Sequence, residues 1–316
     1  MSSLAHTYGI YRFGGPSVIC SHSSPLAPLA AGQLRLQVLS AGINPIDLKT
    51  RAGLGFVAAS KAPEAFLPLG YDVYGEVIAA SDELSALVGQ HAFGMVGFAK
   101  QPGAYSDFLT VARDEVICLP AMNGDVALGG LSLAGLTALQ ALALIPTQLP
   151  LYINAATGGV GHLAVQLAVL QGREVIALTT KLDDAWLANT QQRLAFKVMS
   201  YDYFFATRRG GALLDLIGLE MGARCVLNMN EGAVVVTVPT ISAADITLQA
   251  KAQHIQCVGV VVKPDLAQLA AIYDYVEAQQ LQLRVAKSFP LDEVAAAHEW
   301  MEHTTYSGKV LLIAKN

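Results

Sequence analysis

The chain has 316 residues, of which 53% are hydrophobic and only 14% are charged. An average soluble domain carries about 25% charged residues, so the composition excludes a disordered chain, a coiled coil and a highly charged nucleic-acid binder. The formal net charge of -5 leaves no basic surface for a phosphate backbone. At about 150 residues per domain, the length predicts two domains.

The mean hydropathy of +0.43 raises the question of a membrane segment. The most apolar stretch, residues 131–145, is interrupted by polar residues and glycine, and it falls short of the roughly 20 apolar residues that a spanning helix needs. The first residues show no secretory signal, and the four cysteines are scattered singly. We therefore expect a soluble, cytoplasmic protein with a small-molecule ligand and no membrane or nucleic-acid partner.

The first 120 residues read as short strands separated by turns. Residues 34–39 and 75–79 have strand-like patterns, and residues 103–111 end in a strand-like tail. Glycine and proline punctuate the start of this region, as in Gly14-Gly15-Pro16. The pattern predicts an irregular β domain without long helices.

The pattern changes after residue 122. It predicts a helix at residues 131–144, a strand at 151–154, a helix at 162–170 and a strand at 174–178. Further apolar runs follow at residues 212–217, 233–238 and 255–262. Strands that alternate with helices indicate a parallel sheet with crossover helices.

The last part of the chain is predicted to form two helices and a closing strand. Pro264 can begin a helix that runs to about residue 280. A second helix is expected near residues 292–303, and a strand at residues 308–313 ends the chain. The predicted organisation is a β domain, an α/β domain and a return segment.

The strongest local signal is a glycine-rich turn between the strand at 151–154 and the helix at 162–170. Its sequence is Asn154-Ala155-Ala156-Thr157-Gly158-Gly159-Val160-Gly161, in the strand–turn–helix context that a dinucleotide-binding fingerprint requires. Gly158 would let the backbone approach a pyrophosphate, and Gly161 would let helix and strand pack closely. Ala156 replaces the first glycine of the usual pattern, so a turn that only packs a βα unit stays open as an alternative.

The end of the next strand bears on the choice of cofactor. An NAD site carries Asp or Glu about 20 residues on, where it holds the ribose 2′-hydroxyl. Here the strand ends in Thr179-Thr180-Lys181, without an acid. A hydroxyl and an ammonium suit a 2′-phosphate, which favours NADPH. The alternatives are that Lys181 is a solvated lysine or that Asp183 and Asp184 compete for it.

Six segments stand in a recognisable order along the chain. They are Asn44-Pro45-Ile46-Asp47-Leu48-Lys49, Gly70-Tyr71-Asp72-Val73-Tyr74-Gly75, Leu133-Ala134-Gly135-Leu136-Thr137-Ala138, the turn of residues 155–161, Phe289-Pro290-Leu291 and Ser307-Gly308-Lys309-Val310. Together they resemble the zinc-independent medium-chain dehydrogenases/reductases, and within them the quinone oxidoreductases and enone reductases. The sequence departs from that pattern at residues 201–212, because this stretch is shorter than the resemblance predicts before the segment at residues 213–218.

The resemblance implies an α/β fold with two domains. A doubly wound parallel Rossmann sheet is expected at residues 122–262, and a GroES-like irregular β-barrel at residues 1–121 and 263–316. Zinc enzymes of the superfamily carry Cys in the first motif and a His-Glu pair in the second. Here those places hold Ile43-Asn44-Pro45 and Tyr71-Asp72, so no metal is expected.

The resemblance also implies a site in the cleft between the domains, with Asn44, Lys49 and Tyr71 as candidate catalytic residues. Asn44 would lie beside the nicotinamide ribose or the substrate, Lys49 would stabilise a developing oxyanion, and Tyr71 would donate its hydroxyl. The alternatives are an Asn-Pro turn residue, a lysine paired with Asp47 or Asp72, and a core aromatic. The candidate cofactor contacts come from both domains: Asn44, Thr137, Thr157, Gly158, Gly159, Val160, Thr180, Lys181, Tyr201, Pro239, Val258, Gly308 and Lys309.

Without a Lewis acid, hydride delivery to a conjugated acceptor is the natural reaction. We therefore expect an NADPH-dependent quinone or enone reductase. An enoyl-thioester reductase and a non-catalytic NADPH-binding protein stay open as alternatives. The almost wholly apolar strand at residues 255–262 predicts a symmetric homodimer, because an exposed edge of that kind tends to pair.

Overall fold

The computed structural model describes residues 4–62, 64–120 and 125–315 and divides the chain into two compact units. The first unit comprises Met1–Ala134, Lys263–Glu277 and Leu283–Asn316, and the second comprises Gly135–Val262 and Ala278–Gln282. The expected domain boundaries were at residues 121/122 and 262/263, and the two units divide at 134/135 and 262/263, with residues 278–282 added to the second unit. That the two parts are separate folding domains stays a prediction.

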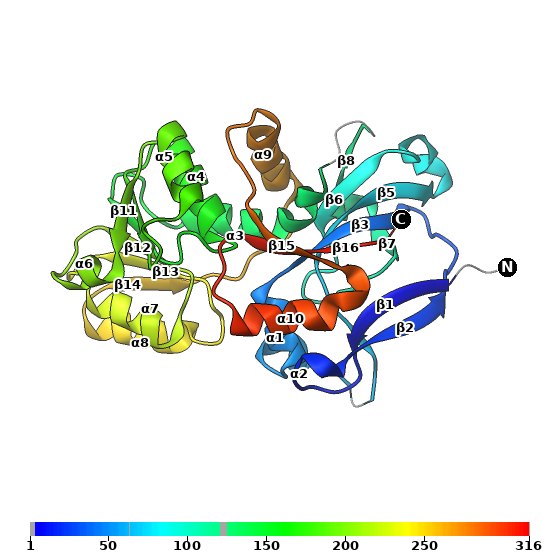
Figure 1. Ribbon diagram of the computed structural model, residues 1–316, viewed down its shortest axis with the longest axis horizontal. Coiled ribbons are helices and arrows are strands. Elements are labelled where there is room, and N and C mark those ends of the chain that lie inside the picture. Colours follow the sequence, from blue (N-terminus) through cyan, green and yellow to red (C-terminus); the bar gives the residue numbers. More distant parts are fainter. Residues whose placement is uncertain (1–3, 63, 121–124, 316) are drawn as a thin grey trace. The chain divides into compact units, whose positions relative to one another are not determined.

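The second unit is built on a six-stranded parallel sheet (Figure 1). Its strands are β9 (Leu151–Ile153), β10 (Val175–Thr179), β11 (Lys197–Ser200), β12 (Ala212–Asp215), β13 (Val234–Thr237) and β14 (Gln256–Gly259). The spatial order is β11-β10-β9-β12-β13-β14, which is the 3-2-1-4-5-6 order of the doubly wound fold. The order reverses between β9 and β12, so that point is the expected ligand-binding crevice of the sheet.

Helices cover both faces of this sheet, with α4 and α5 on one side and α7 and α8 on the other (Figure 1). Their bounds are α4 Gly161–Leu170, α5 Ala185–Arg193, α6 Tyr201–Phe205, α7 Leu219–Leu227 and α8 Ala243–Ala252. All residues of β9, β10 and β12 are buried, because a parallel sheet is covered on both faces and its strands read as continuous apolar runs. This burial explains why these strands were visible in the sequence.

The first unit holds two sheets. The larger one has the order β15-β16-β3-β5-β6-β8, and β7 also pairs with β3. Its bounds are β3 Gln33–Ile43, β5 Asp72–Ala80, β6 His91–Met95, β7 Phe108–Ala112, β8 Val116–Leu119, β15 Val285–Pro290 and β16 Lys309–Ile313. The smaller sheet joins β1 (Leu4–Ile10) to β2 (Ile19–Pro25) and β4 (Leu67–Pro68). The closing segment of the chain thus returns to the first unit through β16, which pairs with β3.

Helices of the first unit are few and mostly short. They are α1 (Pro45–Arg51), α2 (Gly55–Ala59), α9 (Leu266–Glu277) and α10 (Val294–His303), while α3 (Ser132–Ala143) begins in the first unit and continues in the second. Aliphatic residues of β3, β5, β16 and α10 form one buried core. The second unit has a core of its own around β10, β12 and β13.

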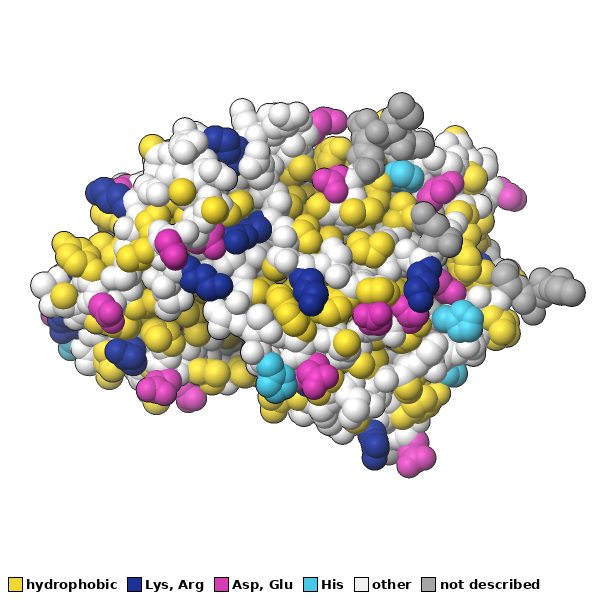
Figure 2. Space-filling model, in the orientation of Figure 1, with side chains coloured by type: hydrophobic (Ala, Val, Ile, Leu, Met, Phe, Trp, Pro, Cys, Tyr) yellow, Lys and Arg dark blue, Asp and Glu magenta, His cyan; other side chains and the backbone are white. Residues whose placement is uncertain are grey.

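The predicted α/β fold, with a parallel Rossmann-like sheet and a separate β unit, is confirmed. In the second unit, the sequence analysis missed the short elements β11, α5, α6, α7 and α8. Within the described residues, no helix is long and apolar enough to cross a membrane. Acidic and basic side chains are interspersed on the face drawn in Figure 2, without a patch of one sign.

Candidate active site

The glycine-rich turn joins β9 to α4 at the point where the strand order of the sheet reverses. Gly161 begins α4, and a Cβ atom at this position would lie 2.1 Å from the carbonyl oxygen of Ala155. Only glycine allows this approach of helix to strand. At Gly158 the same distance would be 3.1 Å, which is also tight.

The turn presents backbone donors that the protein leaves unused. Within the described residues, the N–H groups of Thr157, Gly159 and Val160 donate no hydrogen bond, and α4 has no side-chain cap. Free N–H groups at the start of a helix favour an anion. The residues present therefore fit the pyrophosphate of a dinucleotide.

Tyr201 is hydrogen-bonded to the backbone of this turn. Its hydroxyl accepts a hydrogen bond of 3.0 Å from the N–H of Ala155, a residue held at φ 46°, where residues other than glycine are uncommon. Burial raises the pKa of Tyr201 to about 12, so the hydroxyl stays protonated. Tyr201 thus contacts the turn itself, and the predicted contact of Tyr201 with the cofactor stays a prediction.

Asp215, a buried acid that the sequence analysis missed, connects the ends of neighbouring strands through hydrogen bonds. Asp215, at the end of β12, accepts hydrogen bonds from the Asn154 amide (2.7 Å) and from the Thr237 hydroxyl (2.8 Å). It also accepts from the N–H groups of Ile217 and Gly218. The carboxyl ends of β9, β12 and β13 are thereby fixed to one another. An acid at the end of a short apolar strand was the available signal.

The end of β10 carries no acid. Thr179 is buried, Thr180 is exposed and Lys181 is half-buried, and the N–H of Lys181 donates to the Thr179 hydroxyl (3.0 Å). Asp184 caps α5 by accepting from the N–H groups of Trp186 and Leu187. The residues predicted to hold a 2′-phosphate therefore lie at the expected edge of the sheet.

In the first unit, α1 begins at the Asn44-Pro45 turn, and the Asn44 side chain is wholly engaged inside the protein. Its Nδ2 donates to Asp72 (2.9 Å) and to the Gly42 carbonyl (3.3 Å), and its Oδ1 accepts from Lys309 (2.5 Å). Asn44 is 1% exposed. These contacts serve the fold, and a contact with the nicotinamide ribose stays a prediction.

Asp72 and Lys309 form a buried ion pair at the centre of this network. The Lys309 Nζ lies 3.5 Å from Asp72 Oδ2 and donates to the Ile43 carbonyl (3.2 Å). The other oxygen of Asp72 accepts from the N–H of Leu133 (2.6 Å) at the start of α3, where a negative charge favours the helix. Burial raises the pKa of Asp72 and lowers the pKa of Lys309.

Asp47 adds a second carboxylate to the same region. It accepts hydrogen bonds from the N–H groups of Asn44 (2.9 Å) and Gly70 (3.3 Å) and from the Tyr105 hydroxyl (2.9 Å). Burial raises the pKa of Asp47 to about 7, although the hydrogen bonds from Asn44 and Tyr105 act to lower it. The network thus contains two acids and a single lysine, Lys309.

Among the described residues, neither Lys49 nor Tyr71 is hydrogen-bonded to this network. Among the described residues, neither Asp47 nor Asp72 has a hydrogen bond or ion pair with Lys49, so the pairing weighed as an alternative is wrong. Lys49 is half-buried in α1, and its burial lowers its pKa. The hydroxyl of Tyr71 is buried and has no hydrogen-bond partner in the described part of the chain, and burial raises its pKa. Whether either group contacts a ligand stays a prediction.

The remaining predicted contacts lie in several elements. Thr137 is buried in α3, Pro239 is buried just after β13, and Val258 is 42% exposed in β14. Gly308 has φ 98°, and a Cβ atom there would lie 2.4 Å from the Arg284 carbonyl oxygen. Their roles toward a cofactor stay predictions.

Metal-binding side chains are not clustered in the described part of the chain. No group of three or more His, Cys, Asp or Glu residues there is placed to hold a metal ion. At the two places where zinc enzymes carry ligands, Asn44 and Asp72 are instead bound to each other and to Lys309.

Comparisons with known proteins agree with this architecture. The chain matches the model of the alcohol dehydrogenase GroES-like domain over residues 30–121 and that of zinc-binding dehydrogenase over residues 163–312. The solved quinone oxidoreductase from Coxiella burnetii is 30% identical, with a TM-score of 0.87, over 99% of this chain and 100% of that chain.

Two further proteins extend the likeness. The quinone oxidoreductase of Homo sapiens is 25% identical in an alignment of 324 positions that covers 96% of this chain and 96% of that one. The Escherichia coli quinone oxidoreductase, solved in complex with NADPH, is 19% identical with a TM-score of 0.76, over 98% of this chain and 99% of that one. At this identity the last comparison shows the fold alone.

Proposed function

The chain belongs to the medium-chain dehydrogenase/reductase family, in its quinone oxidoreductase-like branch, and we propose that it is an NADPH-dependent reductase of quinones or α,β-unsaturated carbonyl compounds. The observation that carries this proposal is the Asn44–Asp72–Lys309 network. Asn44 and Asp72 stand at the two places where the family's zinc enzymes carry metal ligands. Here both side chains are hydrogen-bonded within the protein. An acceptor that is already electrophilic needs no Lewis acid.

The cofactor side of the proposal rests on the second unit. The free N–H groups of Thr157, Gly159 and Val160 would hold the pyrophosphate. Thr180 and Lys181 would hold the 2′-phosphate, since no acid stands at the end of β10. NADPH supplies a hydride when it is bound. The work left to the chain is to orient the acceptor and to stabilise charge on its oxygen.

Two groups of the first unit are suited to that task. The buried Tyr71 hydroxyl has no hydrogen-bond partner among the described residues, and in the proposed reaction it would donate to the acceptor oxygen. The Lys49 ammonium is half-buried and bears no ion pair with Asp47 or Asp72, so it can neutralise a developing oxyanion. Removal of one such donor lowers turnover by about 100- to 1000-fold in other enzymes.

The proposal is tested by the rate of NADPH oxidation with three classes of acceptor: quinones, enones and enoyl-thioesters. We expect NADPH to be oxidised with quinones and enones, and faster with them than with enoyl-thioesters. Lys49→Ala should lower the turnover number without changing the Kd for NADPH, because the amine acts on the acceptor. Tight NADPH binding with no turnover on any acceptor would instead identify a non-catalytic binding protein.

A further inference from the structure

Four hydrogen-bond donors converge on the carboxylate of Asp215, which is 0% exposed. Its Oδ1 accepts from the Asn154 amide (2.7 Å) and from the N–H groups of Ile217 (3.2 Å) and Gly218 (3.0 Å). Its Oδ2 accepts from the Thr237 hydroxyl (2.8 Å). A buried polar group whose hydrogen bonds are all made is held in one orientation, so Asp215 is a fixed point at the carboxyl edge of the parallel sheet.

Asn154 extends this constraint to the start of the glycine-rich turn. Its Nδ2 donates to Asp215, and its Oδ1 accepts from the N–H of Leu216 (2.6 Å). Its own N–H donates to the Leu214 carbonyl (3.2 Å). Asn154 is 0% exposed and directly precedes Ala155. The residue from which the turn departs is therefore held by both its side chain and its backbone.

The turn needs this support because its conformation is unusual. Ala155 has φ 46°, and a residue other than glycine keeps such a φ only where its surroundings hold it. The N–H of Ala155 donates to the Tyr201 hydroxyl (3.0 Å), and that of Ala156 donates to the Leu178 carbonyl (3.2 Å). These bonds fix the positions of the donors that stay unused in the described part of the chain, which are the N–H groups of Thr157, Gly159 and Val160.

The Asp215 carboxylate also lies against the start of α7. A Cβ atom on Gly222, in the first turn of α7, would be 2.7 Å from Asp215 Oδ2. Because β9 and β12 are neighbours in the sheet, α4 and α7 both begin at this edge. A helix N-terminus favours a negative charge, and at α7 the protein itself supplies one. Of these two helices, α4 is therefore the one whose start can take a phosphate.

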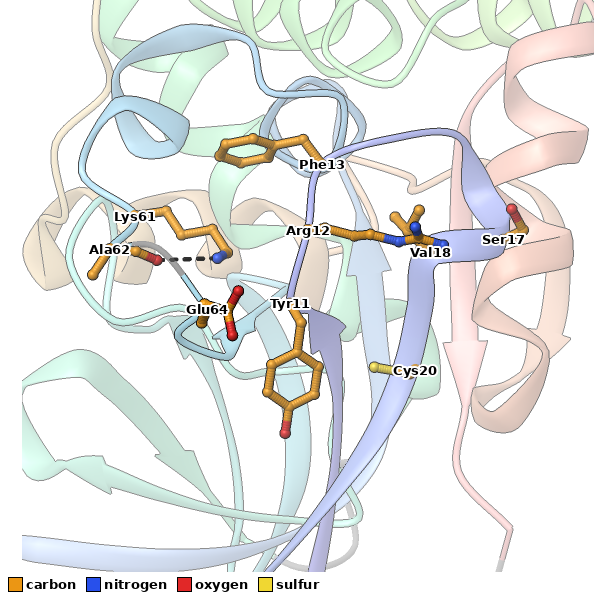
Figure 3. A pocket seen from close by; sticks show the side chains of 9 residues that line it. All are labelled: Tyr11, Arg12, Phe13, Ser17, Val18, Cys20, Lys61, Ala62 and Glu64. Carbon is orange, nitrogen blue, oxygen red and sulfur yellow. Dashed lines mark hydrogen bonds between the residues drawn. The ribbon is translucent and has the colours of Figure 1, made fainter.

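Polar groups do not converge in this way at the open pocket of the first unit (Figure 3). The Arg12 side chain points toward Val18 and away from Lys61. The rings of Tyr11 and Phe13 point in opposite directions. We assign no ligand to this pocket.

We propose that Asp215 is a positioning residue of the dinucleotide site, which acts through Asn154 to hold the turn in the conformation that binds a pyrophosphate. The inference rests on the proposed function, because it takes the turn as the pyrophosphate site. Asp215 acts by accepting hydrogen bonds. An asparagine at this position could present one oxygen to the Oδ1 donors and its amide to the Thr237 hydroxyl, so it should serve nearly as well.

Amide hydrogen exchange of the protein without cofactor tests the positioning step. Asp215→Ala and Asn154→Ala should each speed exchange of the bonded amides of residues 154–158 by at least about tenfold, because the turn opens more often. Asn154→Ala is the milder variant, since Asp215 keeps its other three donors. Asp215→Asn should stay within about threefold of the unaltered chain. The matched control is Asn228→Ala, which removes an amide that donates to the carbonyls of Phe204 and Thr207 in the same unit and should leave the turn unchanged.

Fluorescence titration then tests the consequence for binding, at a temperature where circular dichroism shows every variant folded. Loss of groups that orient a binding site costs about 10- to 100-fold in affinity at metal sites, and we expect Asp215→Ala and Asn154→Ala to raise Kd by a factor of this size. The factor should be the same for NADPH and NADH, because both carry the pyrophosphate. Asp215→Asn and Asn228→Ala should bind both nearly as the unaltered chain does.

Three results would overturn the proposal: unchanged exchange of the turn in Asn154→Ala, an Asp215→Asn protein as impaired as Asp215→Ala, or a loss of affinity for NADPH alone. Failure of the unaltered chain to bind either dinucleotide would refute the proposed function instead. The exchange rates would still decide whether Asp215 holds the turn, since they are measured without cofactor.

Discussion

Lys309 holds together a group of side chains that are far apart in the sequence. It contacts Asn44 and Asp72, which precede it by 265 and 237 residues. The side chains of Lys309 and Asp72 are 3% and 0% exposed, so the two charges of this ion pair have little access to water. Such a pair adds little net stability over an apolar replacement of both members, but loss of one member leaves the other charge buried and uncompensated.

Lys309→Met should therefore reduce the free energy of unfolding by about 3–5 kcal/mol. The matched control is Lys315→Met, which breaks the exposed pair of Lys315 with Asp292 and should change the free energy of unfolding far less, because water screens an exposed pair. Urea unfolding followed by circular dichroism measures both. The double variant Asp72→Asn/Lys309→Met should lose less than the sum of its single variants. A Lys309→Met protein as stable as the Lys315→Met protein would contradict this account of the network.

Asp47 should make stability depend on pH. Its folded-state pKa is raised to about 7, whereas an unfolded Asp titrates near 3.9. The folded chain therefore holds a proton that the unfolded chain releases, and this stabilisation is complete below about pH 4 and is lost as the pH rises through about 7. Lys309, with its lowered pKa, acts with the opposite sign toward alkaline pH.

The expected result is a free energy of unfolding that falls between pH 5 and pH 7 more steeply in the unaltered chain than in Asp47→Asn. The difference in slope should reach up to about 1.4 kcal/mol per pH unit. Asp82→Asn, at an exposed acid of the same unit, should keep the original slope. Identical slopes in the unaltered chain and Asp47→Asn would mean that Asp47 is ionised throughout this range.

At the scale of elements, the β9–turn–α4 unit and the end of β10 define the candidate cofactor site. The turn contributes backbone donors, and β10 contributes Thr180 and Lys181 at the same edge of the sheet. The backbone donors do not distinguish NADPH from NADH, because both carry a pyrophosphate. Preference between them thus depends on the residues that follow β10.

Lys181→Ala should reduce the preference for NADPH over NADH by about 1.5–3 kcal/mol, through loss of a charge-assisted contact with the 2′-phosphate. Lys197→Ala provides a control, since Lys197 is an exposed lysine of the neighbouring strand β11, paired with Glu174. Fluorescence titration with both cofactors gives the ratio of Kd values. Equal affinities for NADPH and NADH in the unaltered chain would refute the assignment.

How much of each element could be predicted depended on the strength of its sequence pattern. The apolar strands β9, β10 and β12 and the helix α4 were visible, because buried elements of a parallel sheet read as continuous apolar runs. The helix α5 and the strand β11 were not, since their residues are mixed and half exposed. The Asn44–Asp72–Lys309 contacts could not be predicted from residue spacing, because only β3, β5 and β16 pairing brings them together.

At the scale of the whole molecule, β14 is the edge strand of the parallel sheet. It pairs with β13 on one side. On its other side, the strand order of the sheet contains no further described strand. Val258 is 42% exposed and nearby Val261 is 52% exposed. An exposed apolar edge of this kind is a pairing liability that a symmetric partner can cover.

We expect a homodimer that pairs through β14. Size-exclusion chromatography with light scattering should give roughly twice 33.3 kDa at micromolar protein. Val258→Lys should shift the mass toward that of one chain, because a buried lysine opposes edge pairing. Leu248→Lys, at a 69% exposed residue of α8, should leave the mass unchanged. A monomer in the unaltered protein would rule out the dimer.

The most direct test of the proposed reaction is acceptor-dependent oxidation of NADPH by protein dialysed against a strong chelator. The loss of reduced-cofactor absorbance is followed with a panel of quinones and enones, with NADPH and then with NADH. The network of Asn44, Asp72 and Lys309 predicts full activity after dialysis, with a faster reaction from NADPH. No acceptor-dependent oxidation, or activity that is lost on dialysis and restored by zinc, would contradict the account.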